Sequence, residues 1–77
     1  MQFSIQVLDE DGDAVVGKRV GVMFTSIFRG GLEAFTDDDG LAVFDYDVDP
    51  GEIDIYVNGE KQATHYVEDG DGFTVNI

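Results

Sequence analysis

The sequence contains no cysteine, one histidine and only four basic residues, against seventeen acidic residues. The absence of cysteine excludes disulfide bonds, thiol catalysis and zinc sites built from thiolates. The scarcity of lysine and arginine argues against direct binding of DNA, RNA or an anionic membrane surface, because clusters of these residues recognise phosphate groups. With a formal net charge of −13 at pH 7, the remaining partners are cations, basic proteins or neutral surfaces.

Long apolar runs are also missing, and none approaches the ~20 residues of a membrane span. The first residues alternate and lack the basic head and continuous apolar segment of a secretory signal, so we expect a cytoplasmic protein. A hydrophobic content of 43% is too high for a disordered acidic tail. The 77 residues predict one domain, 1–77, with a thin core, because so short a chain buries only about 60% of its unfolded surface.

Apolar and polar residues alternate with a period of two along most of the chain, which is typical of strands with one buried face. Turn-forming residues separate these segments, and no segment shows a helical period. Asn58-Gly59 is the strongest hairpin signal, and Arg29-Gly30-Gly31 predicts another hairpin connection. The pattern predicts a small all-β, antiparallel, seven-stranded β-sandwich. The predicted strands are 3–7, 18–28, 32–36, 41–46, 52–57, 60–67 and 73–77.

Three segments carry motif residues at the spacing of a known family. They contribute Asp9, Gly12, Val15 or Val16, Gly17 and Val20; then Thr36, Asp37, Gly40 and Phe44; then Pro50, Gly51, Ile53, Ile55, Val57 and Gly59. Over nearly its whole length the chain thereby resembles the carboxypeptidase-regulatory-like, or transthyretin-like, β-sandwich family. The resemblance implies an immunoglobulin- or transthyretin-like sandwich with a non-catalytic accessory or binding role, and it transfers no catalytic residues.

The residues that catalysis would need are not arranged for it in the sequence. Transthyretin-like hydrolases that open hydroxyisourate use several His and Arg residues and a C-terminal tetrapeptide, which this chain lacks. His65 is the only imidazole, and Ser4 and Ser26 lie in strand-like segments without a nucleophile elbow. We expect His65 to be a partly buried, hydrogen-bonded residue that shares a strand face with Ala63 and Val67. We therefore predict that the protein is not an enzyme.

Two turns are rich in carboxylates and raise the alternative of a calcium-dependent structural module, although we expect no cofactor. If the strands alternate in direction, the loop 9–17 and the loop 36–40 lie at the same end of the domain. Calcium prefers six to eight oxygen ligands, but Asp and Gly also form turns without any ion, and the EF-hand pattern is absent. The candidate ligands are Asp9, Asp11, Asp13, Asp37 and Asp39.

Asp45, Asp47 and Asp49 alternate, so on a strand they project from one side about 7 Å apart, twice the rise per residue. Such a row resembles the charge spacing of a nucleic-acid backbone. It suggests a second alternative, an acidic mimic of nucleic acid that inhibits a nucleic-acid-binding enzyme, as phage-encoded inhibitors of restriction or CRISPR systems do. The simpler interpretation is a solvated strand face.

Alternation also places some large side chains on outer strand faces, where they favour contact with a protein partner. These candidates are Met23 and Phe35, together with Tyr56 and its neighbour Asp54 on the same strand face. The excess of Asp over Lys is typical of proteins from a high-salt, halophilic background. The preferred function is therefore a small, acidic, non-catalytic binding or accessory module that engages a protein partner.

Overall fold

The computed structural model describes residues 1–26 and 30–77, in which all regular structure is β-strand. Within those ranges, no helix has the length and apolarity needed to cross a membrane. The strands are β1 Gln2–Leu8, β2 Arg19–Phe24, β3 Gly31–Phe35, β4 Leu41–Asp45, β5 Gly51–Val57, β6 Glu60–Val67 and β7 Gly72–Asn76.

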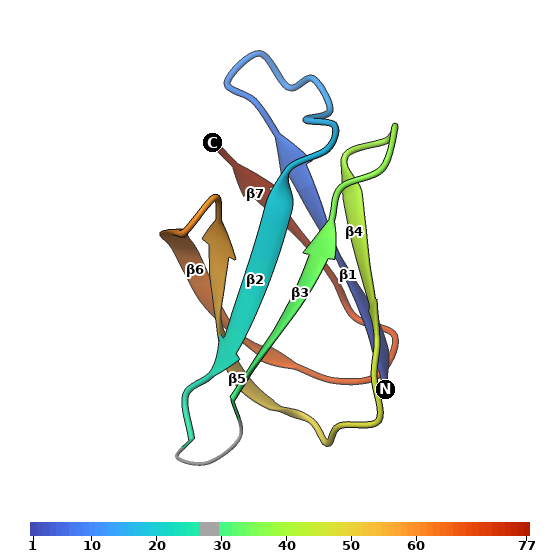
Figure 1. Cartoon of the computed structure of the whole chain (residues 1–77), viewed down its shortest axis with the longest axis vertical. Helices are drawn as coiled ribbons and strands as arrows, with labels where there is room; N and C mark the ends of the chain where they lie inside the picture. The colour runs from blue at the N-terminus through green and yellow to red at the C-terminus, as the bar shows by residue number, and fades with distance from the viewer. Residues whose placement is uncertain (27–29) are drawn as a thin grey trace.

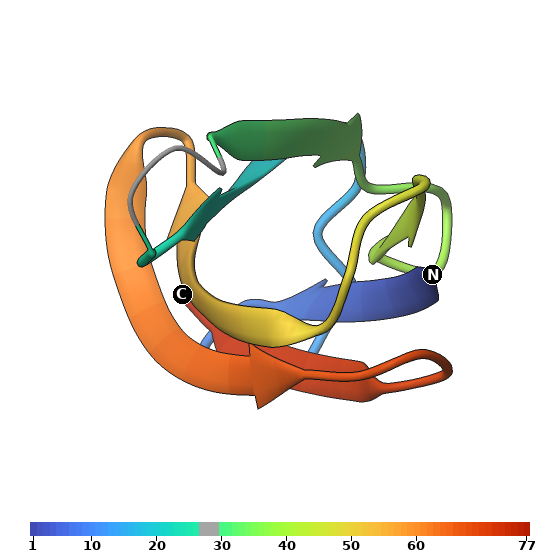
Figure 2. The same ribbon diagram turned by 90° about the horizontal axis from the view of Figure 1, so that it is seen from below.

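The strands form two sheets that face one another, one with the order β4-β1-β7 and the other with the order β3-β2-β5-β6 (Figure 1). Hairpins join β2 to β3 and β5 to β6 within the four-stranded sheet. The other connections cross from one sheet to the other. Seen from below, β6 curves from the four-stranded sheet towards β7 (Figure 2). The predicted all-β fold with seven strands is confirmed.

The prediction of a purely antiparallel sandwich is wrong, because β1 and β7 pair in parallel, with Ile5 opposite Phe73 and Val7 opposite Val75. The strands alternate in direction along the chain, so the first and the seventh run the same way. When these two strands become neighbours in one sheet, their pairing has to be parallel. The remaining pairs of strands are antiparallel.

Four predicted strands run past their observed ends, the third and the seventh by one residue each, at Thr36 and Ile77. The second was expected to reach residue 28, but β2 ends at Phe24, and Thr25 and Ser26 form a bend. The rest of that prediction, together with Arg29 of the expected hairpin turn, falls in 27–29, outside the described residues. The fourth was expected to include Tyr46, but β4 ends at Asp45.

The core is a single layer of side chains between the two sheets, supplied by the inward-facing position of each strand. Phe3 and Phe44 stack within it, with ring centroids 4.9 Å apart and planes inclined by 6°. Burial of this layer provides the main driving force for folding. The buried residues are Phe3, Ile5, Val7, Val20, Val22, Phe24, Ala42, Phe44, Ile53, Ile55, Val57, Val67 and Val75.

Two aromatic contacts lie where the edges of the two sheets meet. The Tyr46 hydroxyl donates a hydrogen bond of 3.0 Å to the backbone carbonyl of Glu33, which links the end of β4 to β3. On the opposite side, His65 of β6 stacks on Phe73 of β7, with ring centroids 4.4 Å apart. These two contacts link the two sheets at opposite edges of the sandwich.

We expect Phe44→Ala to lower the free energy of unfolding by about 3–5 kcal/mol, because it removes a fully buried ring from a thin core. This loss is comparable to the whole stability of a small domain, about 5–15 kcal/mol. Urea denaturation followed by circular dichroism measures it. Phe35→Ala is the matched control, since Phe35 is 61% exposed, and its effect should stay within about 0.5 kcal/mol. Equal losses in the two variants would contradict the assignment of the core.

Candidate functional site

The outer face of the four-stranded sheet carries the apolar side chains that are the candidate partner contacts. Alternation along β2 buries Val20 and Val22 and turns Gly21 and Met23 outward. The same rule turns Tyr56 outward on β5, where it lies opposite Gly21 in the register. Met23 is 48% exposed. The predicted outward orientation of Met23 and Tyr56 is confirmed.

Two further aromatic side chains extend this surface to the edges of the sheet. Phe35 on the edge strand β3 is 61% exposed, and Tyr66 on the opposite edge strand β6 is 60% exposed. Phe35 lies opposite Arg19, whereas Tyr66 lies opposite Glu52, so the two aromatic residues stand at opposite ends of the face. We call Met23, Phe35, Tyr56 and Tyr66 the outer patch.

Gly21 creates a hollow in the middle of the outer face. Its φ angle is outside the left-handed region, and a Cβ placed there would lie 3.9 Å from the Leu32 carbonyl and 4.0 Å from Tyr56 Cβ, which are ordinary contacts. Neither the backbone nor the packing therefore requires glycine here. An open hollow of about 400 Å³ lies over this position, lined by Arg19, Gly21, Val22, Met23, Gly31, Leu32, Glu33, Tyr56 and Gly59.

Sequence reasoning did not find this hollow. The usable signal was a glycine in the middle of a strand, which weakens the strand and often marks a close approach of a ligand or another backbone. Gly31 differs from Gly21, because a Cβ there would lie 2.5 Å from Met23 Sδ. The Met23 side chain thus covers Gly31 and forms one wall of the hollow.

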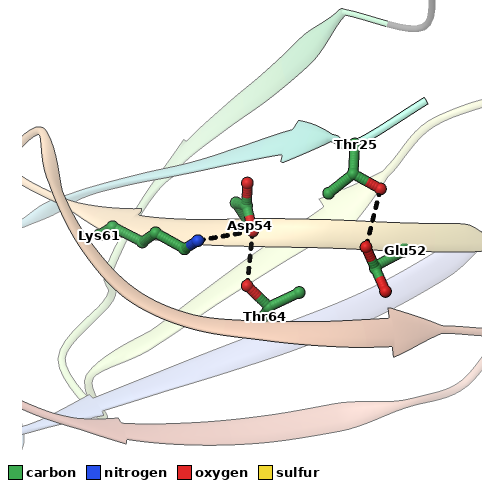
Figure 3. A network of polar contacts seen from close by, with 5 residues as sticks. All are labelled: Thr25, Glu52, Asp54, Lys61 and Thr64. Atoms are coloured by element: carbon green, nitrogen blue, oxygen red, sulfur yellow. Dashed lines mark hydrogen bonds and ion pairs between the residues drawn. The ribbon is translucent and has the colours of Figure 1, made fainter. Parts of the chain in front are cut away.

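Charges on this face are paired within the protein. Arg19 Nε lies 3.8 Å from an oxygen of Glu33, and Lys61 Nζ lies 3.2 Å from Oδ1 of Asp54. The Thr64 hydroxyl also donates a hydrogen bond to Oδ1 of Asp54 (Figure 3). This hydrogen bond and the nearby Lys61 hold the pKa of Asp54 below its ordinary value. Asp54, a predicted partner contact, is therefore already engaged with its own neighbours.

A second polar contact on β5 lies beside this network. The Thr25 hydroxyl donates a hydrogen bond of 3.0 Å to Oε1 of Glu52 (Figure 3). Glu52 keeps its charge, so this face carries Arg19 and Lys61 against Glu33, Glu52 and Asp54, a small acidic excess compared with the −13 of the whole protein.

The predicted row of Asp45, Asp47 and Asp49 does not form on a strand. Asp45 is the last residue of β4. The backbone then bends, and the Val48 N–H donates a hydrogen bond of 2.9 Å to the Tyr46 carbonyl. A contact between residues two apart forms a tight turn around Asp47, which breaks the regular strand spacing. The three residues are exposed, but the spacing of about 7 Å inferred from an extended strand does not apply.

The carboxylate of Asp9 organises the first acidic turn through the backbone. Its Oδ1 accepts hydrogen bonds of 2.9 Å from the N–H groups of Asp11 and Asp13. The Gly12 N–H donates to the Asp9 carbonyl, and Gly12 has a positive φ of 84°. Asp is common in turns for this reason, because its short side chain accepts hydrogen bonds from the backbone N–H groups that follow it.

Asp37 forms the same turn in the second acidic loop. Its Oδ1 accepts hydrogen bonds from the N–H groups of Asp39 and Leu41, at 2.9 and 3.0 Å. Gly40 occupies the position equivalent to Gly12 and packs closely on β1, where a Cβ would lie only 2.7 Å from the Val7 carbonyl. The two acidic loops lie near one another at the upper end of Figure 1, as predicted.

Only part of the predicted calcium ligand set comes together. Carboxylate oxygens of Asp9, Asp11 and Asp13 lie within 4.8 Å of one another. Asp37 and Asp39 do not join this group, which is the one such cluster among the described residues. The reason is local, because the Asp37 carboxylate faces the N–H groups of its own turn. The hydrogen bonds of Asp9 likewise hold its turn without an ion.

Comparisons with known proteins bear on the fold alone. No family model matches the chain, and a search of curated proteins gives no match. Among solved structures, the chain is similar to the Bacillus anthracis TIE protein, with a TM-score of 0.69 and 15% sequence identity over 99% of this chain. The chain spans 15% of the length of that protein. This likeness supports a β-rich fold, and at such low identity it says nothing about activity.

We expect calcium to raise the melting temperature no more than KCl of equal ionic strength does. Three clustered carboxylates supply at most six oxygens, the lower limit of the roughly six to eight that calcium takes, and Oδ1 of Asp9 is already hydrogen-bonded. Thermal melts by circular dichroism in the two salts check this. A calcium-specific rise that disappears in Asp11→Asn and persists in Asp38→Asn would instead establish an ion site at the first turn.

Proposed function

We propose that the protein is a non-catalytic binding module that engages a protein partner through the outer face of its four-stranded sheet. The observation that carries the proposal is the outer patch, where Met23, Phe35 and Tyr66 are each about half exposed or more. Aromatic residues and methionine are the residue types enriched at the centre of protein interfaces. A surface of this kind contributes binding energy when a partner covers it.

The placement of the acidic residues supports a partner that is a protein. Only Glu33, Asp45, Glu52, Asp54 and Glu60 lie in strands, and the other acidic residues lie in the connections between strands. Most acids therefore gather at the two ends of the domain, and on the outer face Glu33 and Asp54 are paired with Arg19 and Lys61. Acids around the ends of the face are compatible with a protein partner, because the rim of a protein interface is usually polar.

A mimic of nucleic acid is less well supported by this placement. Such a protein requires acids arranged together along one face, whereas here they divide between loops at opposite ends of the long axis (Figure 1). The row expected on β4 is interrupted by the bend at Asp47. The resemblance to carboxypeptidase-regulatory-like domains also favours an accessory role. So does the occurrence of a similar fold within a much longer chain.

The acids in the loops also fit a high-salt background. Loops 9–17 and 36–40 carry carboxylates close together without basic residues between them, apart from the flanking Lys18. Their mutual repulsion opposes folding at low salt and is screened at high salt, where the Debye length falls to about 3 Å at 1 M.

The variant Met23→Ser/Phe35→Ser/Tyr66→Ser should lose partner binding and keep its fold, because all three side chains are largely outside the core. Binding is measured by cross-linking in extracts of the source organism, followed by mass spectrometry and by titration of the purified partner. Alanine-scanning results at interfaces suggest a loss of about tenfold or more.

Val43→Ser is the matched control, since Val43 is 44% exposed on the outer face of the three-stranded sheet. Partner capture that survives the triple substitution but fails in Val43→Ser would place the interface on the other sheet. If both variants still capture the partner, the proposed face is wrong.

The melting temperature should rise from low salt to molar KCl, because the salt screens the net charge of −13. Asp11→Asn/Asp38→Asn/Asp39→Asn should melt higher than the natural protein at low salt and gain less from KCl. The carboxylates of these three residues make none of the hydrogen bonds that hold the two turns. Full stability at low ionic strength, without divalent ions, would contradict the halophilic interpretation.

A further inference from the structure

The hollow over Gly21 has no explanation in the folding of the sheet. Gly21 lies on a central strand with ordinary strand geometry, and a larger residue would fit without a clash. Glycine in a strand interior costs stability through backbone entropy, and it provides no side chain to pack. A costly residue that the fold does not need points to a requirement on the outer surface.

We propose that this hollow is an anchor site for one large apolar side chain of an extended, basic-ended peptide segment of the partner. The inference rests on the proposed function and names the partner's chemistry. Tyr56 and Met23 form the apolar walls, and the thioether of methionine adapts to side chains of different shapes. A volume of about 400 Å³ lies at the small end of the range of ligand pockets, about 300–1,000 Å³.

Charge complementarity identifies the kind of segment that fits. Near the hollow, Arg19 is paired with Glu33 and Lys61 with Asp54, so the centre of the face offers little net charge. Apart from Asp45, Glu52 and Glu60, the other carboxylates lie in the connections between strands, at the two ends of the domain. A complementary segment is therefore apolar in its middle and carries Lys or Arg towards both of its ends.

The dimensions of the domain set the length of this segment. The longest axis of the domain measures 35 Å. An extended peptide rises about 3.3 Å per residue, so about ten residues reach from one acidic end to the other. A second copy of the chain is a poor occupant by the same reasoning, because it would bring two charges of −13 together.

The test is selection from a phage library of random peptides of about ten residues, with the natural protein as bait and again with Gly21→Val as bait. We expect the selected peptides to carry a large apolar residue near the middle and Lys or Arg towards the ends. Synthetic copies should bind Gly21→Val about tenfold or more weakly, because valine occupies the anchor site. Gly21→Val should melt at the same or a higher temperature, since valine favours strands.

Ser4→Val is the matched control. Ser4 is on the outer face of β1, the central strand of the other sheet, and lines a second hollow of about 370 Å³ with Leu41 and Val43. This substitution should leave peptide binding unchanged. Weaker binding to Ser4→Val than to Gly21→Val would overturn the inference and move the anchor to the second hollow.

The remaining outcomes separate this inference from the proposed function. Peptides that bind natural protein and Gly21→Val equally, yet fail on the triple Met23, Phe35 and Tyr66 variant, overturn the anchor and leave the binding face in place. If the selected peptides are acidic or neutral, or if none is selected, the proposal of a basic-ended segment is wrong. Partner capture from extracts tests the binding face independently of the peptide selection. A dimer in sedimentation experiments that Gly21→Val dissociates would show that a second copy is the occupant.

Discussion

The packing of one layer of apolar side chains between the two sheets is the interaction on which the rest of the molecule depends. The chain has neither disulfides nor a helix within its described residues to reinforce that layer. Inward strand positions are therefore committed to the core, as the stacked rings of Phe3 and Phe44 illustrate. The polar and charged residues, apart from buried Thr36 and half-buried residues such as His65, lie on outer faces and in loops. Any binding function has to be built there.

Local chemistry made much of the fold predictable from the sequence. Alternation located the seven strands, and the Asp-Gly and Asn-Gly pairs located the turns, because both signals act over a few neighbouring residues. The parallel pairing of β1 with β7 depends on which strands become neighbours in space, and no local pattern encodes that. The end of β4 was misjudged for a related reason. Asp47 continues the alternation, but the chain must leave the sheet there to cross to β5.

The exposed side chains of the candidate site were predictable from the sequence. The hollow at Gly21, which has no side chain, was not. Met23, Phe35 and Tyr56 follow from strand alternation, whereas the hollow exists only because neighbouring strands place Glu33 and Tyr56 on either side of Gly21. The five carboxylates named for the calcium alternative do not all come together, and the local hydrogen bonds give a reason. A carboxylate that caps its own turn, as those of Asp9 and Asp37 do, is oriented towards the backbone N–H groups of that turn through its Oδ1.

Separation of charge from apolar surface gives folding and binding opposite responses to salt. On the proposed halophilic interpretation, screening relieves repulsion between the acidic loops, and we expect the folded state to gain stability as salt rises. The same screening shortens the reach of those loops towards a basic partner, to about 3 Å in 1 M salt. Under such conditions the affinity has to come from contacts that salt does not weaken, and burial of apolar surface is strengthened by excluded salts. In the proposed mode of binding, the hollow walled by Met23 and Tyr56 is the place for such a contact. An acidic module in a salt-rich environment therefore needs an apolar anchor more than a neutral module in dilute buffer does.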